Sequence, residues 1–142
     1  RGLGDVYKRQ KLYCGRDTGA GEIGSIPYLD RDYEYYCSSR FFVGRGTTGK
    51  EAYERAAAGD PEALALWREF GGHVGQLVML VLYTYDPEAI VFGGSIAHAF
   101  GFFREAMYEQ LKRFPYAKTV EGLHICCSNI DHVGLLGASA CE

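Results

Sequence analysis

The run from Asp60 to Ser95 constrains the fold more than any other part of the sequence. Asp60 is a natural helix N-cap, and Pro61 at the first helical position loses no hydrogen bond. The apolar residues that follow have the three-and-four spacing of one helical face: Leu64, Trp67, Phe70, Val74, Leu77, Val78 and Val81. The pattern predicts a long buried helix that ends before Asp86-Pro87, because proline disfavours helical geometry in the residue before it.

A short apolar run, Ala89 to Phe92, follows that helix and is bounded by turn signals. Such a run is typical of a strand buried on both faces in a parallel sheet. Gly93, Gly94 and Ser95 come directly after it. Open α/β sheets bind their ligands at the carboxyl ends of their strands, so these three residues are candidate ligand contacts.

The other elements have weaker signals. Helices are expected at 50–58, capped by Thr47 or Thr48, at 100–114 and at 131–142, with a second buried strand at 122–128. The helix at 50–58 would form an α-hairpin with the long helix. Strands separated by helices imply parallel crossovers, so the fold class is α/β.

Composition limits the classes of function. A chain of 142 residues with 47% hydrophobic content predicts one domain, and a net charge of -3 gives no electrostatic reason to expect nucleic acid as a partner. The longest apolar stretch, 77–83, is far shorter than the ~20 residues that cross a bilayer. No secretory signal opens the chain, so we expect a cytoplasmic protein without a membrane partner.

The first ten residues, Arg1 to Gln10, show no periodicity and resemble a translated adapter. We therefore expect residues 1–10 to be a non-native leader and residues 11–142 to be the domain, with the natural protein starting upstream. The segment 26–42 is dense in tyrosine and charge, and it fits either an irregular surface loop or part of a binding wall.

Glu22 lies between glycines, where a carboxylate can approach a carbohydrate and accept hydrogen bonds from neighbouring hydroxyls; a solvated loop residue is the alternative. Five cysteines and four histidines show no ligand spacing. The sequence predicts free, buried thiols and no metal site.

Several motifs together resemble the ROK family (repressor, open reading frame, kinase). They are GAGEIGS at 19–25, AGDPEAL at 58–64, DPEAIVFGGSI at 86–96 and GLLGASA at 134–140. The resemblance implies the carboxyl-terminal part of an actin-like ATPase (ribonuclease H-like) fold, with an α-hairpin insertion. It covers nearly everything after Gln10.

The family's enzymes are ATP-dependent sugar kinases that use Mg²⁺, so the resemblance implies a fragment of a glucokinase-like hexose kinase. By the same analogy, Glu22 and Ser25 would bind a hexose or amino-hexose, and Gly93, Gly94 and Ser95 would bind the nucleotide. The catalytic aspartate of the family lies upstream of these motifs, so we expect no catalytic residue in this chain and negligible activity from it alone. A homodimer is also expected.

Two departures from the family pattern affect these expectations. Ser25 stands where family members often carry a histidine that contacts sugar and helps hold zinc. The zinc-binding cysteine cluster is replaced by YYCSSRFF at 35–42, so zinc is not expected. The alternatives are the ligand-sensing domain of a sugar-responsive repressor, in which case nucleic acid is a partner, and a non-catalytic assembly module.

Overall fold

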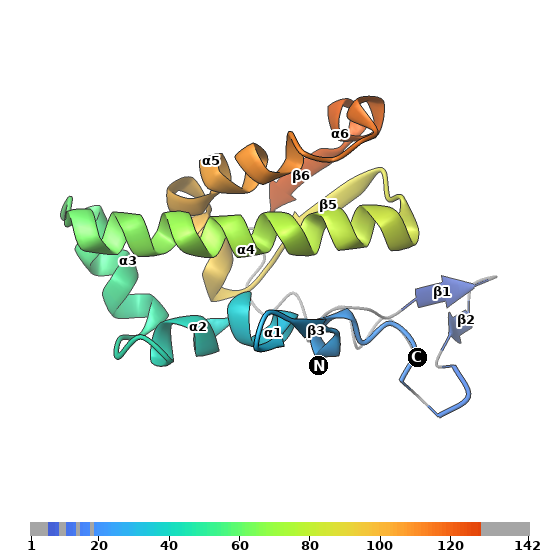
Figure 1. The fold of residues 1–142 in the computed structure, drawn as a ribbon, viewed down its shortest axis with the longest axis horizontal. Helices are drawn as coiled ribbons and strands as arrows, with labels where there is room; N and C mark the ends of the chain where they lie inside the picture. Colours follow the sequence, from blue (N-terminus) through green and yellow to red (C-terminus); the bar gives the residue numbers. More distant parts are fainter. Residues whose placement is uncertain (1–5, 9–10, 14, 18, 129–142) are drawn as a thin grey trace.

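The long helix is the centre of the molecule. The computed structural model describes residues 6–8, 11–13, 15–17 and 19–128, and helix α4 (Pro61–Tyr85) runs through its middle (Figure 1). The Asp60 side chain accepts a hydrogen bond from the Glu62 amide at 2.9 Å, which satisfies one free donor of the first turn. Asp86 ends the helix in the left-handed conformation, with φ 45°. The prediction for this helix is confirmed.

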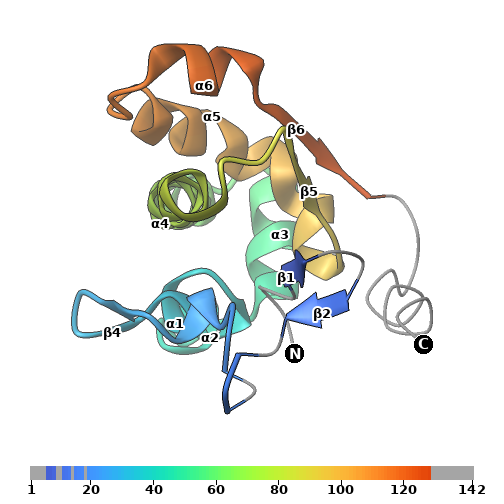
Figure 2. The same ribbon diagram turned by 90° about the vertical axis from the view of Figure 1, so that its right-hand side faces the viewer.

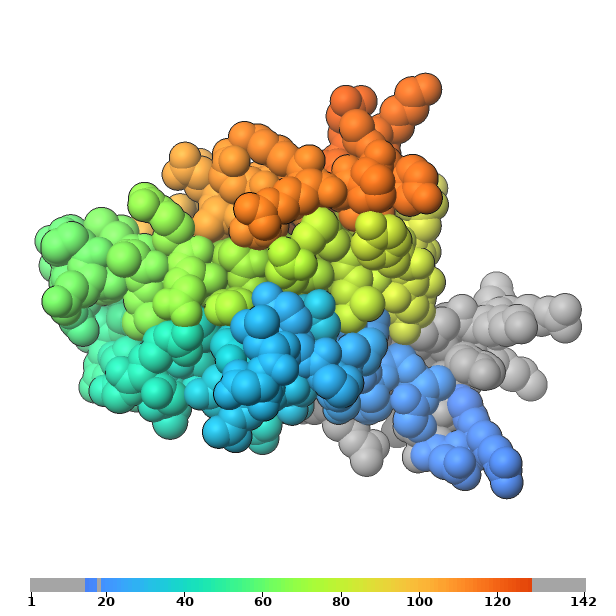
Figure 3. All heavy atoms as spheres, viewed as in Figure 1, coloured from blue at the N-terminus to red at the C-terminus, as the bar shows by residue number. Residues whose placement is uncertain are grey.

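Helix α5 (Phe100–Leu111) packs along one side of α4 (Figure 1). It lies within the helix predicted at 100–114, and its buried face consists of Phe103, Met107 and Leu111. The short helix α6 (Ala117–Gly122) follows and was not predicted. Figure 3 shows the same order on one face of the surface, with α4 between the α5–α6 layer and the layer formed by the earlier part of the chain.

The opposite side of α4 is covered by the tyrosine-rich segment. It forms η1 (Ile23–Ser25), the hairpin of β3 (Pro27–Tyr28) and β4 (Arg31–Asp32), and helices α1 (Tyr33–Tyr36) and α2 (Ser39–Val43). Asp32 and Ser38 cap the two helices with side-chain oxygens that accept backbone N–H bonds. Phe41 and Phe42 are fully buried. Of the two interpretations left open for residues 26–42, the irregular surface loop is wrong; helices of four and five residues are too short to show a period in the sequence.

Helix α3 (Gly49–Ala57) precedes α4 and packs against it as the expected α-hairpin. Thr48, one of the two predicted caps, accepts a hydrogen bond from the Glu51 amide at 3.1 Å. The Glu51 carboxylate accepts one from the Thr48 amide at 2.9 Å in return. This reciprocal pair is a capping box, and it fixes where α3 begins.

Strands β5 (Ala89–Phe92) and β6 (His124–Cys127) pair in parallel, from Ala89 opposite His124 to Phe92 opposite Cys127 (Figure 2). The predicted strands and their direction are confirmed. Burial on both faces is wrong for the described residues, because Ile90, Phe92 and Ile125 pack on the core while the alternate residues are exposed. Cys37, Cys126 and Cys127 are free, as expected, but Cys126 is exposed because it follows this alternation.

The amino-terminal strands β1 (Val6–Lys8) and β2 (Lys11–Tyr13) form an antiparallel hairpin. β1 lies in the predicted leader, and β2 begins the predicted domain. The predicted helix at 131–142 lies outside the described residues. The sequence after β5 forms the 3-10 helix η2 (Ser95–Ala99) and then α5.

Candidate functional site

Glu22 and Ser25 lie on one tight turn. Glu22 precedes η1, and its carbonyl oxygen accepts a hydrogen bond from the Ser25 amide at 3.0 Å. Ile23 anchors the turn, with only 5% of its surface exposed. Glu22 and Ser25, the two candidate sugar-binding residues, are both exposed. The turn therefore presents a carboxylate and a hydroxyl to solvent from a backbone held by a buried neighbour.

Gly94, the second of the two glycines after β5, leaves open space beside the backbone. Gly94 has φ 73°, a conformation that side chains rarely adopt, and no atom lies within 4 Å of the position that a Cβ would occupy. Ser95 then begins η2, and the Ala97 amide donates to the Gly94 carbonyl at 3.1 Å. Gly94 is therefore not enclosed by side chains, so a ligand has room to approach the chain at the carboxyl end of β5.

A cavity of about 610 Å³ lies beside this turn. Residues of four segments line it, from the start of α2, from α3, from α4 and from η2: Cys37, Ser38, Ser39, Gly49, Lys50, Tyr53, Trp67, Ser95, Ile96, His98 and Ala99. Its volume is within the ~300–1,000 Å³ typical of small-ligand sites. Of the five predicted site residues, only Ser95 is among the lining residues of this cavity; Gly93 and Gly94, which precede it in the chain, are not, and neither are Glu22 and Ser25.

The chemistry of this cavity suits a ligand with a flat ring and negative charge. Aromatic surface comes from Tyr53 and Trp67, hydroxyls come from three serines, and Lys50 supplies a cation. None of the described lining residues is acidic. The Trp67 indole N–H is buried without a hydrogen-bond partner in the described part of the chain. Burial raises the pKa of the Cys37 thiol to about 12, so the thiol adds no charge at neutral pH.

The sequence did not indicate Lys50, Tyr53 or Trp67 as site residues. Trp67 was predicted only as part of the core face of α4. It belongs both to the core, with 1% of its surface exposed, and to the lining of the cavity. Lys50 and Tyr53 are three residues apart and so share one face of α3. That spacing was available in the sequence, but nothing local indicated that this face lies opposite η2.

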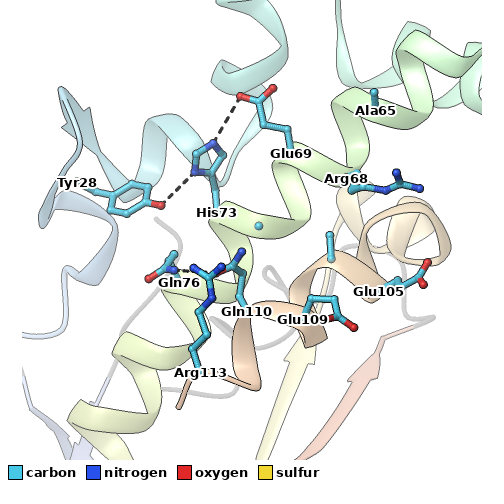
Figure 4. Close-up of a pocket in the computed structure, with 12 residues that line it drawn as sticks. Tyr28, Ala65, Arg68, Glu69, His73, Gln76, Glu105, Glu109, Gln110 and Arg113 are labelled. Carbon is cyan, nitrogen blue, oxygen red and sulfur yellow. Dashed lines mark hydrogen bonds and ion pairs between the residues drawn. The ribbon is translucent and has the colours of Figure 1, made fainter. Parts of the chain in front are cut away.

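A second, shallower hollow of about 720 Å³ lies between α4, α5 and β3 (Figure 4). Its charges are mixed, with Arg68 and Arg113 among the glutamates Glu69, Glu105 and Glu109. Tyr28 reaches across from β3 to His73 on α4 (Figure 4). None of the predicted site residues lines this hollow.

The described residues contain no group of three or more His, Cys, Asp or Glu side chains able to hold a metal ion. Within the same ranges, no helix combines the length and the apolar character needed to traverse a lipid bilayer.

Comparisons with known proteins agree with the motifs in the sequence. Residues 6–141 match the ROK family. A search of curated protein sequences gives no significant match.

Several solved structures share the fold. Three of them are a proposed sugar kinase from Cytophaga hutchinsonii (TM-score 0.79, 20% identity, 92% of this chain and 50% of that one), a ROK transcriptional regulator homologous to the E. coli MLC protein (0.78, 18%, 92% and 40%), and a ROK glucokinase from Streptomyces griseus in complex with glucose and AMPPNP (0.62, 21%, 82% and 48%). The chain thus spans half or less of the length of these structures. It is a mixed α/β unit that matches part of the actin-like fold of this family.

Proposed function

The chain belongs to the ROK family, and we propose that it is the carboxyl-terminal part of an ATP-dependent hexose kinase. In this proposal Gly93, Gly94 and Ser95 bind the nucleotide, and Glu22 and Ser25 bind the sugar. The single observation that carries it is the open backbone at Gly94, next to a cavity of nucleoside size at the carboxyl end of a parallel strand. The catalytic aspartate is supplied by the part of the protein upstream of these motifs.

The nucleotide assignment is supported by the fit between the cavity and the ligand. A purine ring needs flat apolar surface, which Tyr53 and Trp67 provide, and the ribose and phosphates need donors, which the serines and Lys50 provide. None of the described lining residues is acidic, which favours binding of the negatively charged phosphates of the nucleotide. AMPPNP, an ATP analogue, is bound by the related S. griseus glucokinase.

The sugar assignment rests on Glu22. A carboxylate accepts hydrogen bonds from two neighbouring hydroxyls, the arrangement that a hexose or amino-hexose ring offers. Glu22 is exposed and held by the η1 turn, so no other element has to move to admit a ligand. Ser25 lies one turn further along, and its hydroxyl group can donate and accept hydrogen bonds with the hydroxyls of a sugar.

Mg²⁺ bound with the nucleotide would neutralise phosphate charge during transfer, and most of the remaining catalysis would be positioning. This chain's share is to hold the nucleoside at η2 and the sugar at η1. We also propose a homodimer in the cytoplasm. An assembly module without catalysis is the alternative that the Glu22 variant below would detect.

The nucleotide site is tested with the substitution Gly94→Ala. Alanine meets no protein atom there, so the added methyl group would obstruct a bound ligand, but φ 73° also strains any residue other than glycine, and the control must carry a similar strain. The matched control is Gly46→Ala, because Gly46 has φ 74°, also with nothing within 4 Å, and lies after α2, whereas Gly94 directly precedes the lining residue Ser95. We expect the Kd for AMPPNP to rise about tenfold or more in Gly94→Ala and to be unchanged in Gly46→Ala. Equal affinities in the two variants would remove the nucleotide assignment.

The sugar site is tested with Glu22→Gln in the full-length protein. The amide keeps the size of the side chain but turns one acceptor into a donor, so we expect glucose affinity and turnover to fall at least about tenfold. Unchanged sugar affinity together with unchanged turnover would favour the assembly module.

A repressor is the second candidate, favoured by the match to a ROK transcriptional regulator. Such a protein would carry a helix-turn-helix upstream of this chain, and sugar binding at Glu22 would change its affinity for DNA. Sequencing the 5′ end of the gene distinguishes the two, and a sugar-dependent shift of operator binding without sugar phosphorylation would establish the repressor.

A further inference from the structure

His73 joins the tyrosine-rich segment to the central helix. Its Nδ1 lies 3.1 Å from the hydroxyl of Tyr28, a residue 45 positions earlier in the chain (Figure 4). Figure 4 shows the two side chains reaching toward each other from α4 and β3. The bond connects the β3–β4 hairpin directly to α4.

Rings surround this contact on several sides. Tyr28 stacks on Tyr33 with ring centroids 4.3 Å apart and 15° between the planes. The His73 ring lies 4.6 Å from Tyr36 and 5.6 Å from Phe41. The imidazole is therefore held by rings from α1 and α2 as well as by the bond to β3. Such aromatic contacts stabilise the arrangement beyond the area that they bury.

The charges around His73 set the direction of its hydrogen bond. Glu69 on α4 places a carboxylate oxygen 3.7 Å from Nε2, which favours a proton on that nitrogen and leaves Nδ1 as an acceptor. Arg45, which follows α2, pairs with the same carboxylate. Burial raises the pKa of Tyr28 to about 12, so its hydroxyl keeps the proton that it donates.

We propose that His73 is a positioning residue that holds the Tyr28 hairpin against α4 and thereby fixes the turn that carries Glu22 and Ser25. This inference rests on the proposed function only for the role of the turn in sugar binding. The contact itself is independent of any ligand.

Backbone bonds transmit the position of Tyr28 to Glu22. The Tyr33 amide donates to the Ile26 carbonyl at 3.2 Å, closing the hairpin, and the Ile26 amide donates to the Ile23 carbonyl at 3.1 Å, closing η1. The Ile23 amide in turn donates to Gly21 at 2.7 Å. Glu22 lies inside this chain of bonds, so release of the hairpin from α4 would let the Glu22 backbone move.

The test compares two variants of the same residue by amide hydrogen exchange. His73→Phe keeps an aromatic ring and loses the acceptor, whereas His73→Asn loses the ring and keeps an oxygen near the position of Nδ1. Tyr28→Phe removes the hydroxyl from the other side of the bond. Tyr108→Phe, the same chemical change on an exposed residue of α5, is the control.

We expect the Ile26 and Tyr33 amides to exchange about threefold to tenfold faster in His73→Phe and in Tyr28→Phe, the effect of one lost hydrogen bond. His73→Asn is expected to restore part of the protection, while α5 amides and the Tyr108→Phe variant stay at the parent rates. The inference would be overturned if the Ile26 and Tyr33 amides exchanged at the parent rates in both His73→Phe and Tyr28→Phe. It would also be overturned if the amides of α5 exchanged faster by the same factor.

Sugar affinity separates this inference from the proposed function. If both hold, His73→Phe raises the Kd for glucose in the full-length protein and His73→Asn partly restores it. If Glu22→Gln leaves glucose affinity unchanged, the proposed function fails, and the exchange result still decides whether His73 holds the hairpin. The positioning role would be refuted by one combination of results. In it, Glu22→Gln loses glucose affinity, but His73→Phe loosens the hairpin and keeps the glucose affinity of the parent protein.

Discussion

Gly71 on α4 packs so closely against Phe103 on α5 that the Cβ of any other residue at position 71 would overlap the Phe103 carbonyl oxygen. Gly75, one turn further along, has the same relation to α5, because a Cβ there would lie 2.8 Å from the Met107 carbonyl oxygen. These glycines are costly for helix formation, at about 1 kcal/mol each. Their position at the α4–α5 contact explains why they are tolerated.

This contact predicts opposite effects at adjacent glycines. Gly71→Ala should lower the free energy of unfolding by about 1–3 kcal/mol, because α5 must move away from α4. Gly72→Ala meets only the end of the Gln110 side chain, at 3.8 Å, so the better helix propensity of alanine should leave stability unchanged or raise it by up to about 1 kcal/mol. Urea unfolding of the two variants measures both, and equal stability would contradict the close contact.

The capping box at the start of α3 predicts the effect of Thr48→Ala. The substitution removes the acceptor for the Glu51 amide, so we expect a loss of about 1 kcal/mol in thermal or urea unfolding. Thr84→Ala is the comparison, since the Thr84 hydroxyl donates only to the Leu80 carbonyl of its own helix. That variant should be neutral or slightly stabilising. A Thr48→Ala protein as stable as Thr84→Ala would show that the cap adds nothing.

His73 predicts a pH dependence of stability. Burial lowers the pKa of His73 below its usual 6.5, with Arg45 acting in the same direction and Glu69 opposing. The unfolded chain therefore takes up a proton before the folded one does, so stability should fall as the pH drops below about 6.5 and level off below the folded pKa. Urea unfolding at pH 7.5 and 5.5 tests this. The loss of stability between the two pH values should be smaller in His73→Asn. An equal loss in both proteins would argue against a role for His73 in the pH dependence.

Cys37 predicts a difference in thiol reactivity. Its pKa of about 12, raised by burial, leaves almost no thiolate at pH 8. Cys126, by contrast, is exposed and open to the reagent. Peptide mapping after treatment with iodoacetamide should show Cys37 modified on the order of a hundredfold more slowly than Cys126, with the difference lost in urea. Comparable rates in the folded protein would mean that Cys37 is accessible.

The sequence predicted those elements whose signals are local. Asp60, Pro61 and the apolar stripe determine α4 by capping and periodicity, and the apolar run at 89–92 determines β5. The same reasoning located Ser95 at the end of β5, beside the cavity. The family resemblance, confirmed over residues 6–141, was visible in motifs of the sequence, two of which, at 58–64 and 86–96, overlap these elements.

The sequence did not predict features that depend on distant residues. Tyr28 and His73 are 45 positions apart, and neither has a local pattern that indicates the other. Trp67 carries the signal of a core residue, and its place at the cavity follows only from how α3 and η2 pack beside it. The one-sided burial of β5 was missed because a run of apolar residues does not reveal how many layers cover it.

The parallel pairing of β5 with β6 has a consequence for folding. The two strands are adjacent in space, yet residues 93–123, including all of α5, separate them in the chain. Pairing the strands therefore has to close a loop of this length, at a cost in chain entropy, whereas the α3–α4 hairpin needs only its own neighbours. We expect the helical pair to form first and the two-stranded sheet to close last.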